Sequence, residues 1–169
     1  LSAAALDKVV ARPAGEQNWK QLEASAWIPD GSVKAPRVVY TFTDPNCPYC
    51  NRFWRDARPW VDAGKVQLRH VIVGILGPTS APKAAALLEA RDPAAALASH
   101  ARDHAKGGVK PVAQVSEAAR GKLEANAQLM QQLGSFATPT TFYRDAAGIV
   151  RKVQGAPSAE ALASILGPL

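Results

Sequence analysis

Apolar and β-branched residues concentrate in two short segments that flank a region of helical periodicity. Residues 37–43, Arg-Val-Val-Tyr-Thr-Phe-Thr, and residues 66–73, Val-Gln-Leu-Arg-His-Val-Ile-Val, have the composition of buried strands. Between the two strands, helical spacing relates the apolar residues Phe53, Trp54, Ala57, Trp60 and Val61. The order strand, helix, strand predicts a βαβ unit with two parallel strands and a right-handed crossover.

The helix of this unit is expected to begin at the cysteines. Asp44-Pro-Asn46 interrupts the preceding strand, and Pro48 suits the first turn of a helix, where a backbone N–H has no partner in any case. Pro59 is expected to kink the helix, and Gly64 is expected to end it.

The remainder of the chain predicts a helical region followed by a hairpin and a last helix. Helices are expected over 81–91, 93–106 and 116–133, with breaks at Asp92-Pro93 and Gly107-Gly108. Residues 140–143 and 149–153 predict two strands joined by a turn, and Ser158 is expected to cap a helix that runs to Leu166. The predicted fold is one α/β domain with a helical insertion, about 78–133, before the C-terminal hairpin and helix.

The first thirty residues predict short, interrupted elements. Residues 1–24 are expected to form a short helix, a break at Pro13 and Gly15, and a second helical segment around Trp19. Pro29-Asp30-Gly31 predicts a turn. The four tryptophans are expected to anchor the core and the helix packing rather than to stack on a substrate; they are Trp19, Trp27, Trp54 and Trp60.

Composition excludes some classes of protein. The chain has 169 residues, of which 47% are hydrophobic and 20% charged, as in an ordinary globular domain. Its formal net charge is +6, but the basic residues are scattered and interleaved with acidic ones, and no aromatic and basic motif accompanies them. Nucleic-acid binding is therefore not expected.

The two cysteines carry more information than the charge. They form the motif Cys47-Pro48-Tyr49-Cys50, and a disulfide between them would close too short a loop to stabilise a fold. The motif is also half of a zinc site, but the chain has no third cysteine. His100 and His104 have i, i+4 spacing, yet they lie about fifty residues further on and are expected on an exposed helix face. The pattern favours redox chemistry.

The order of the cysteines along the helix assigns their roles. A thiolate is the attacking species in disulfide exchange, and the amino end of a helix favours the negative sulfur. Cys47, at that end and at an exposed edge, is the expected nucleophile. Cys50, one turn further in and more buried, is expected to resolve the mixed disulfide. Tyr49 is expected to present its ring at the surface beside the substrate.

The motif and its surroundings resemble one family. Residues 43–50, Thr-Asp-Pro-Asn-Cys-Pro-Tyr-Cys, are similar to the active-site segment of the bacterial DsbC/DsbG disulfide isomerases, and most similar to that of the DsbG members. The similarity continues through residues 52–54, 58–61 and 64–68, Asp92-Pro93, Leu133-Gly134 and Thr138-Pro139, and so spans nearly all of the chain.

The resemblance implies a periplasmic protein with a thioredoxin fold. It implies that Thr138-Pro139 is a cis-proline loop facing Cys47, and that these two residues bind substrate together with Pro48 and Tyr49. It further implies isomerase or reductase action on misoxidised or sulfenylated cysteines of periplasmic proteins. Electrons would come from a membrane reductase of the DsbD type. The redox centre is the Cys47–Cys50 pair itself, with no other cofactor and no metal.

Some features depart from related patterns. Thioredoxin has a tryptophan just before the first cysteine and a buried aspartate six residues before it, where this chain has Asn46 and Thr41. Residues 1–24 resemble the linker of the family and residues 25–169 its catalytic domain. Full-length members are homodimers through a further N-terminal domain that this sequence lacks, so we expect a monomer. Two alternatives stay open: a chaperone-type binding module for unfolded periplasmic proteins and a thiol-based metal carrier.

Overall fold

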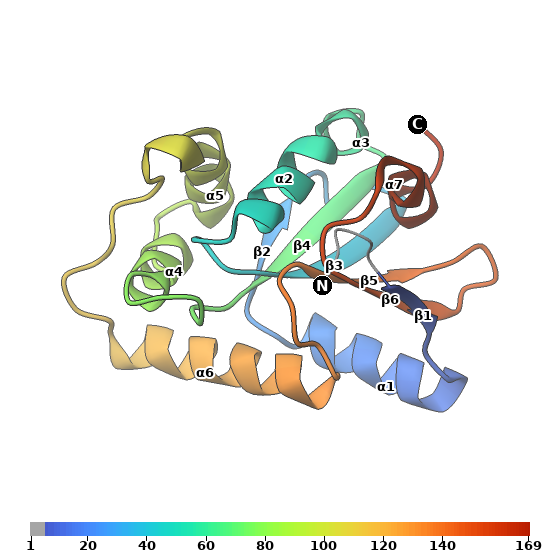
Figure 1. Cartoon of the computed structure of the whole chain (residues 1–169), viewed down its shortest axis with the longest axis horizontal. Helices are drawn as coiled ribbons and strands as arrows, with labels where there is room; N and C mark the ends of the chain where they lie inside the picture. The colour runs from blue at the N-terminus through green and yellow to red at the C-terminus, as the bar shows by residue number, and fades with distance from the viewer. Residues whose placement is uncertain (1–5) are drawn as a thin grey trace.

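A mixed six-stranded sheet forms the centre of the protein (Figure 1), in the order β1-β6-β5-β3-β4-β2. The computed structural model describes residues 6–169. The strands are β1 (Leu6–Val9), β2 (Trp27–Asp30), β3 (Arg37–Thr43), β4 (Val66–Ile72), β5 (Thr140–Arg144) and β6 (Val150–Gln154). The pair β3–β4 is parallel, and the other neighbouring pairs are antiparallel.

The predicted βαβ unit is confirmed. Helices α2 (Pro48–Asp56) and α3 (Arg58–Asp62) connect β3 to the parallel strand β4, and Pro48 occupies the first turn of α2. The predicted kink is a break at Ala57, between the two helices and two residues before Pro59. Gly64 follows α3 with φ of +74°, a backbone conformation that favours glycine.

The predicted structure of the N-terminal residues is wrong in two respects. Residues 6–9 form β1, which pairs with β6, and α1 (Arg12–Glu23) runs without a break through Pro13 and Gly15. Pro13 lies in the first turn, where proline is tolerated. A Cβ on Gly15 would lie 3.2 Å from Cβ of Val150, so glycine permits close packing of helix on sheet. Residues 1–5 lie outside the described part of the chain. The domain division at residue 24 stays a prediction.

The segment predicted as a turn at Pro29-Asp30-Gly31 is partly a strand. Residues 27–30 form β2 at the edge of the sheet, antiparallel to β4. An edge strand tolerates Pro29, because a residue there has only one neighbouring strand to bond. The turn itself begins at Gly31, whose φ is +109°. This strand places Asp30 opposite the middle of β4.

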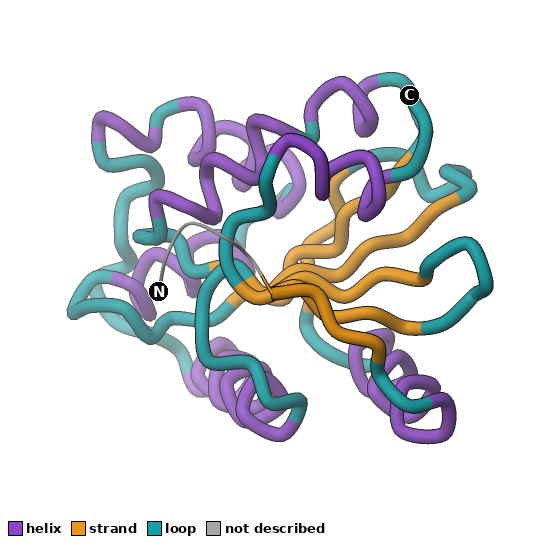
Figure 2. The backbone as a smooth tube through the Cα atoms, turned by 45° about the vertical axis from the view of Figure 1, so that its right-hand side comes forward, coloured by secondary structure: helices purple, strands orange, loops and turns teal. Residues whose placement is uncertain are grey.

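The two faces of the sheet carry separate hydrophobic clusters, because side chains alternate along each strand. Helices α1 and α6 (Glu117–Gln132) cover the face that presents Tyr40 and Phe42. Helices α2, α3 and α7 (Ala159–Leu166) cover the other face, which presents Val39. Figure 2 shows the strands as a twisted layer between these two sets of helices.

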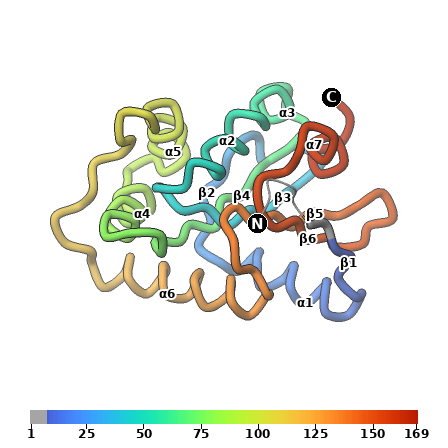
Figure 3. The backbone as a smooth tube through the Cα atoms, in the orientation of Figure 1, coloured from blue at the N-terminus to red at the C-terminus, as the bar shows by residue number. Residues whose placement is uncertain are grey.

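The predicted helical insertion lies between β4 and β5. It contains α4 (Ser80–Leu88), α5 (Pro93–Arg102), the short 3₁₀ helix η1 (His104–Lys106) and α6. A third cluster, which includes Ile28, Ile72, Leu87 and Leu97, joins α4 and α5 to the sheet. Figure 3 shows α5 beside α2, so the insertion forms one wall of the region around the cysteines. Within residues 6–169, no helix combines the length and apolarity that crossing a bilayer requires.

Candidate active site

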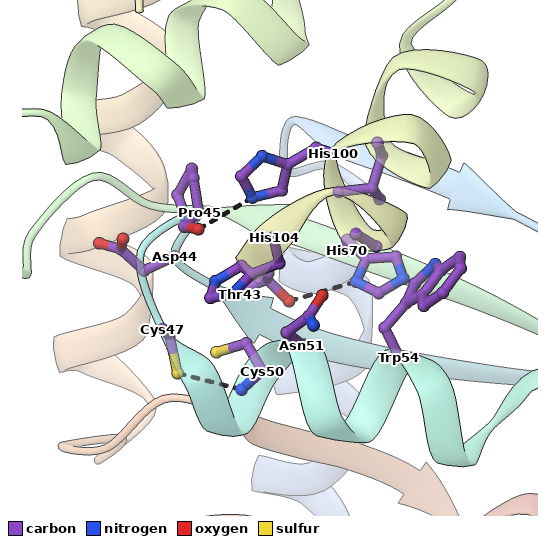
Figure 4. A pocket seen from close by; sticks show the side chains of 12 residues that line it. Thr43, Asp44, Pro45, Cys47, Cys50, Asn51, Trp54, His70, His100 and His104 are labelled. Atoms are coloured by element: carbon purple, nitrogen blue, oxygen red, sulfur yellow. Dashed lines mark hydrogen bonds between the residues drawn. The ribbon is translucent and has the colours of Figure 1, made fainter. Parts of the chain in front are cut away.

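The two cysteines lie at the amino end of α2 (Figure 4). Cys47 is the N-cap residue, and its Sγ accepts a hydrogen bond of 3.1 Å from the backbone N–H of Cys50. Both are free thiols in this structure. A helix N-terminus with an unpaired N–H directed at a sulfur is an arrangement that stabilises a thiolate.

The two thiols differ in acidity. A hydrogen bond from the Cys50 thiol lowers the pKa of Cys47 to about 7, against the opposing effect of burial, with further help from Thr138 and from backbone N–H groups. Burial raises the pKa of Cys50 well above that of an ordinary thiol, and the neighbouring Cys47 sulfur raises it further. Near neutral pH a substantial fraction of Cys47 is therefore thiolate, whereas Cys50 stays a thiol.

The expected contrast in exposure is not found. Cys47 is 3% exposed and Cys50 is 4% exposed, so Cys47 does not lie at an open edge. The loop that precedes β5 lies against the sulfur of Cys47. The Cys47 thiol donates a hydrogen bond of 3.4 Å to the carbonyl of Thr138 in this loop. Tyr49, by contrast, is 56% exposed, as predicted.

The Thr138–Pro139 bond is cis, as the resemblance implied. The preceding segment is held by several hydrogen bonds: Lys152 Nζ donates to the carbonyls of Leu133 and Gly134, and Gln154 accepts from the N–H of Phe136. The structure thus brings Thr138 against Cys47 from the opposite end of the sequence. Phe136, 81% exposed, lies two residues before this contact.

A buried carboxylate organises the loop before the cysteines. Asp44 accepts hydrogen bonds from the backbone N–H groups of Asn46, Ile75 and Leu76, at 2.7–3.0 Å, and from the hydroxyl of Ser80. The carboxylate therefore joins the β3–α2 loop to the segment after β4. Sequence reasoning treated Asp44 only as a strand breaker.

The prediction that His100 lies on an exposed helix face is wrong. His100 is 5% exposed, accepts a hydrogen bond from the N–H of Val109 at Nδ1, and donates from Nε2 to the carbonyl of Pro45 at 2.9 Å. The physical reason is the Gly107-Gly108 turn after η1, which folds the following chain back over the ring. His100 thus ties the loop before Cys47 to the chain that follows η1.

A second buried network lies on the same face of the sheet and was not found from the sequence. His70 on β4 bonds Thr43 Oγ1 at 3.2 Å through Nδ1 and Asp30 Oδ2 at 3.0 Å through Nε2. Arg58 donates to both oxygens of Asp30, and its guanidinium lies 3.8 Å from the centre of the Trp54 ring. The one available signal was a histidine inside a strand with the composition of a buried strand.

The cysteines and this network share a small cavity. It measures about 20 Å³ and is lined by Thr43, Asp44, Pro45, Cys47, Cys50, Asn51, Trp54, His70, Leu97, His100, Ala101 and His104. Among residues 6–169 there is no cluster of three or more histidine, cysteine, aspartate or glutamate side chains arranged to hold a metal ion.

A cysteine pair at a helix N-terminus, facing a cis-proline loop on this sheet, defines the thioredoxin-like class of proteins. A family model described as a thioredoxin-like domain matches residues 32–168. The catalytic domain of Proteus mirabilis ScsC superposes with a TM-score of 0.75 at 26% identity, over 92% of this chain and 96% of that domain.

Two curated relatives place the chain more narrowly. The thiol:disulfide interchange protein DsbG of Pseudomonas aeruginosa is 50% identical over 168 residues, and DsbG of Escherichia coli is 40% identical over 167 residues. Each alignment covers 99% of this chain and about two thirds of the relative, 66% and 67%. The chain belongs to the DsbG family of thiol:disulfide interchange proteins.

Proposed function

We propose that this chain is the catalytic unit of a periplasmic thiol–disulfide oxidoreductase that reduces or isomerises misoxidised cysteines of other proteins. The observation that carries the proposal is the split in acidity between two adjacent thiols, with Cys47 at a pKa of about 7 and Cys50 raised by burial. Such a pair supplies one thiolate that attacks the substrate and one thiol that later resolves the mixed disulfide.

The order of the two reaction steps follows from the difference in pKa between Cys47 and Cys50. The Cys47 thiolate attacks one sulfur of a substrate disulfide, the substrate S–S bond breaks, and the leaving thiolate takes a proton from solvent. Cys50 then loses its proton and attacks Cys47 Sγ, which releases the second substrate thiolate and forms the Cys47–Cys50 disulfide. Two electrons pass from the protein dithiol to the substrate. With a sulfenic acid as substrate, the first attack releases water and the second step is the same.

The residues around Cys47 support a role in binding an extended substrate segment. The exposed Tyr49 ring and Pro48 flank Cys47 on α2, and the Thr138-Pro139 loop flanks it on the other side. A substrate strand that pairs with the backbone of this loop would direct its own sulfur at Cys47.

The family supports a proposal for the partners and the location of the protein. Cysteine-containing periplasmic proteins are the proposed substrates, and a membrane reductase of the DsbD type is the proposed electron donor. The 169-residue polypeptide is proposed to be monomeric, with residues 1–24 acting as the linker of the family. Sedimentation at micromolar concentration tests this point, and a stable dimer would contradict it.

The test of the proposed function is the stoichiometric reduction of a disulfide-linked peptide by the reduced protein, followed by mass spectrometry. The wild type is expected to reduce one peptide disulfide per molecule, and the double variant Cys47→Ala/Cys50→Ala none.

Aggregation assays on the same double variant distinguish a chaperone-type binding module from an oxidoreductase, since holding an unfolded chain needs no thiol. Titration of the reduced protein with zinc tests the metal-carrier alternative. Equal peptide reduction by the wild type and the double variant would contradict the proposal.

A further inference from the structure

The second half of the exchange needs a base that the proposed function has not yet assigned. Cys50 must lose a proton before it attacks Cys47, and its thiol is 4% exposed. A buried thiol cannot pass its proton directly to bulk water, so a group inside the protein has to receive it. The cavity of about 20 Å³ beside Cys50 is the place to search, because it has room for one water molecule.

Two polar groups in this cavity are already fully engaged. The carboxylate of Asp44 accepts four hydrogen bonds, from three backbone N–H groups and the Ser80 hydroxyl. Both ring nitrogens of His100 are occupied by backbone groups, the Pro45 carbonyl and the Val109 N–H. Neither can take up a proton without losing one of these bonds. Thr41, on the same sheet face, is neutral and accepts from the hydroxyl of Thr141.

His70 differs from Asp44 and His100, because it has a ring nitrogen that can take up a proton. Asp30 is an acceptor only, so His70 Nε2 carries the hydrogen of their 3.0 Å bond, and the neutral ring has its lone pair at Nδ1. That lone pair faces the rotatable hydroxyl of Thr43 at 3.2 Å. The Thr43 hydroxyl lines the cavity together with Cys50 (Figure 4). A hydroxyl can accept one hydrogen bond while it donates another, so it can pass a proton from the cavity to the ring.

The surroundings stabilise the charge that this transfer creates. Asp30 is held by two hydrogen bonds from Arg58, at 3.0 and 2.5 Å, and its carboxylate is directed at His70. A carboxylate on the far nitrogen orients an imidazole and stabilises the imidazolium. The charged and titratable groups that surround the ring come from β2, the β3–α2 loop, α2, α3, α5 and η1; they are Asp30, Asp44, Cys47, Cys50, Arg58, His100 and His104.

We infer that His70, oriented by Asp30, is the proton acceptor for the Cys50 thiol, and that a water in the cavity and the Thr43 hydroxyl carry the proton to it. This inference rests on the proposed function. In the step, the S–H bond of Cys50 breaks, the proton passes through the water to Thr43 Oγ1, and the original hydroxyl proton of Thr43 moves to His70 Nδ1. The Cys50 thiolate attacks Cys47 Sγ, the Cys47–Cys50 bond forms, and the substrate thiolate leaves. The proton later leaves His70 by the same route, through Thr43 Oγ1 and the cavity water, and the released substrate thiolate takes it up.

The two halves of the exchange can be timed separately with dithiodipyridine, whose thiopyridone product absorbs light. Attack by Cys47 releases the first thiopyridone, and attack by Cys50 on the mixed disulfide releases the second. In His70→Gln we expect the first phase to keep its rate and pH midpoint. The second phase is expected to slow by about a hundredfold near neutral pH, the lower end of what a positioned base contributes. Thr43→Val is expected to act in the same direction.

Three further variants keep the test decisive. Asn126→Leu removes a buried amide of α6, on the other face of the sheet, which bonds Ala26 and Ile72; it reports what lost stability alone does to the two phases. Asp30→Asn is expected to slow the second phase, because the imidazolium of His70 then loses the carboxylate that stabilises it. If the wild type shows both phases and folded His70→Gln keeps the second unchanged, the inference is wrong while the proposed function stands. Loss of the second phase in His104→Gln but not in His70→Gln would also overturn it. If the wild type shows no second phase, the proposed function itself fails.

Discussion

The backbone N–H of Cys50 lies 3.1 Å from Cys47 Sγ, so the residue that later resolves the mixed disulfide also stabilises the attacking thiolate. Both sulfurs are buried, and they differ in acidity rather than in exposure. Selectivity between the two cysteines is therefore electrostatic. It follows from their places in the first turn of α2 and from the loop that ends at Thr138.

Alkylation of the reduced protein should follow the titration of Cys47. With its pKa lowered to about 7, Cys47 is mostly thiol below that pH and mostly thiolate above it, so the iodoacetamide rate should rise with pH and level off above about 7. Because the Cys50 thiol is the largest cause of the lowering, Cys50→Ala should move the midpoint upward, toward the ordinary value of 9.0. An unchanged midpoint in Cys50→Ala, read by mass spectrometry of the labelled peptide, would disprove this cause.

The Asp30 network should make stability depend on acid pH. Burial raises the pKa of Asp30, but hydrogen bonds from His70 and Arg58 outweigh it and lower the pKa to about 2 from 3.8. The ionised form therefore stabilises the folded state; the contribution is fully present above about 3.8 and is lost as pH falls through about 2. Asp30→Asn should reduce the free energy of unfolding at neutral pH by about 3 kcal/mol, as for a broken buried ion pair.

Urea unfolding across this pH range checks the prediction. The gap between the wild type and Asp30→Asn should shrink between pH 3.8 and about 2. Asp56→Asn is the matched control, because Asp56 pairs with Arg52 on the surface and should change stability by less than about 1 kcal/mol. A gap that stays constant down to the lowest pH would contradict the account.

Gly108 should be required for the position of His100. Its φ is +68°, and a Cβ there would lie 2.1 Å from Nδ1 of His100. Gly107 is the natural control, since its φ is +100° but a Cβ would meet nothing within 4 Å. Both alanine variants incur backbone strain of about 1–2 kcal/mol. Gly108→Ala should lose clearly more stability and should release Pro45 from His100. Equal losses of unfolding free energy in the two variants would refute this role.

Local patterns predicted the parts of the fold whose residues meet nearby partners. The apolar runs of β3 and β4, the hairpin β5–β6 and the Ser158 cap of α7 were confirmed. The strand β2 was missed, because Pro29-Asp30-Gly31 has turn composition and only its pairing with β4 makes it extended. The break expected in α1 was wrong, because the packing of Gly15 against Val150 outweighs the low helix propensity of glycine.

The residues of the site also fall into those that the sequence predicted and those that it did not. The motif located Cys47 and Cys50, and the family resemblance located Thr138 and Pro139. The residues that hold the site in place could not be predicted from a motif, because the residues they contact lie far away in the sequence. Asp30 meets His70 forty residues later, and His100 meets Pro45 fifty-five residues earlier. No spacing rule relates such residues before the sheet and the insertion bring them together.

The most direct test of the account uses single cysteine variants and a disulfide-linked peptide. Cys50→Ala should form a long-lived mixed disulfide between Cys47 and the peptide, because no second thiol remains to release it. Cys47→Ala should form almost none, since the raised pKa of Cys50 keeps it a thiol. The measurement is intact mass under non-reducing conditions, followed by peptide mapping. Accumulation on Cys47 alone is the predicted result, and comparable accumulation on Cys50 in Cys47→Ala would contradict the assignment of the nucleophile.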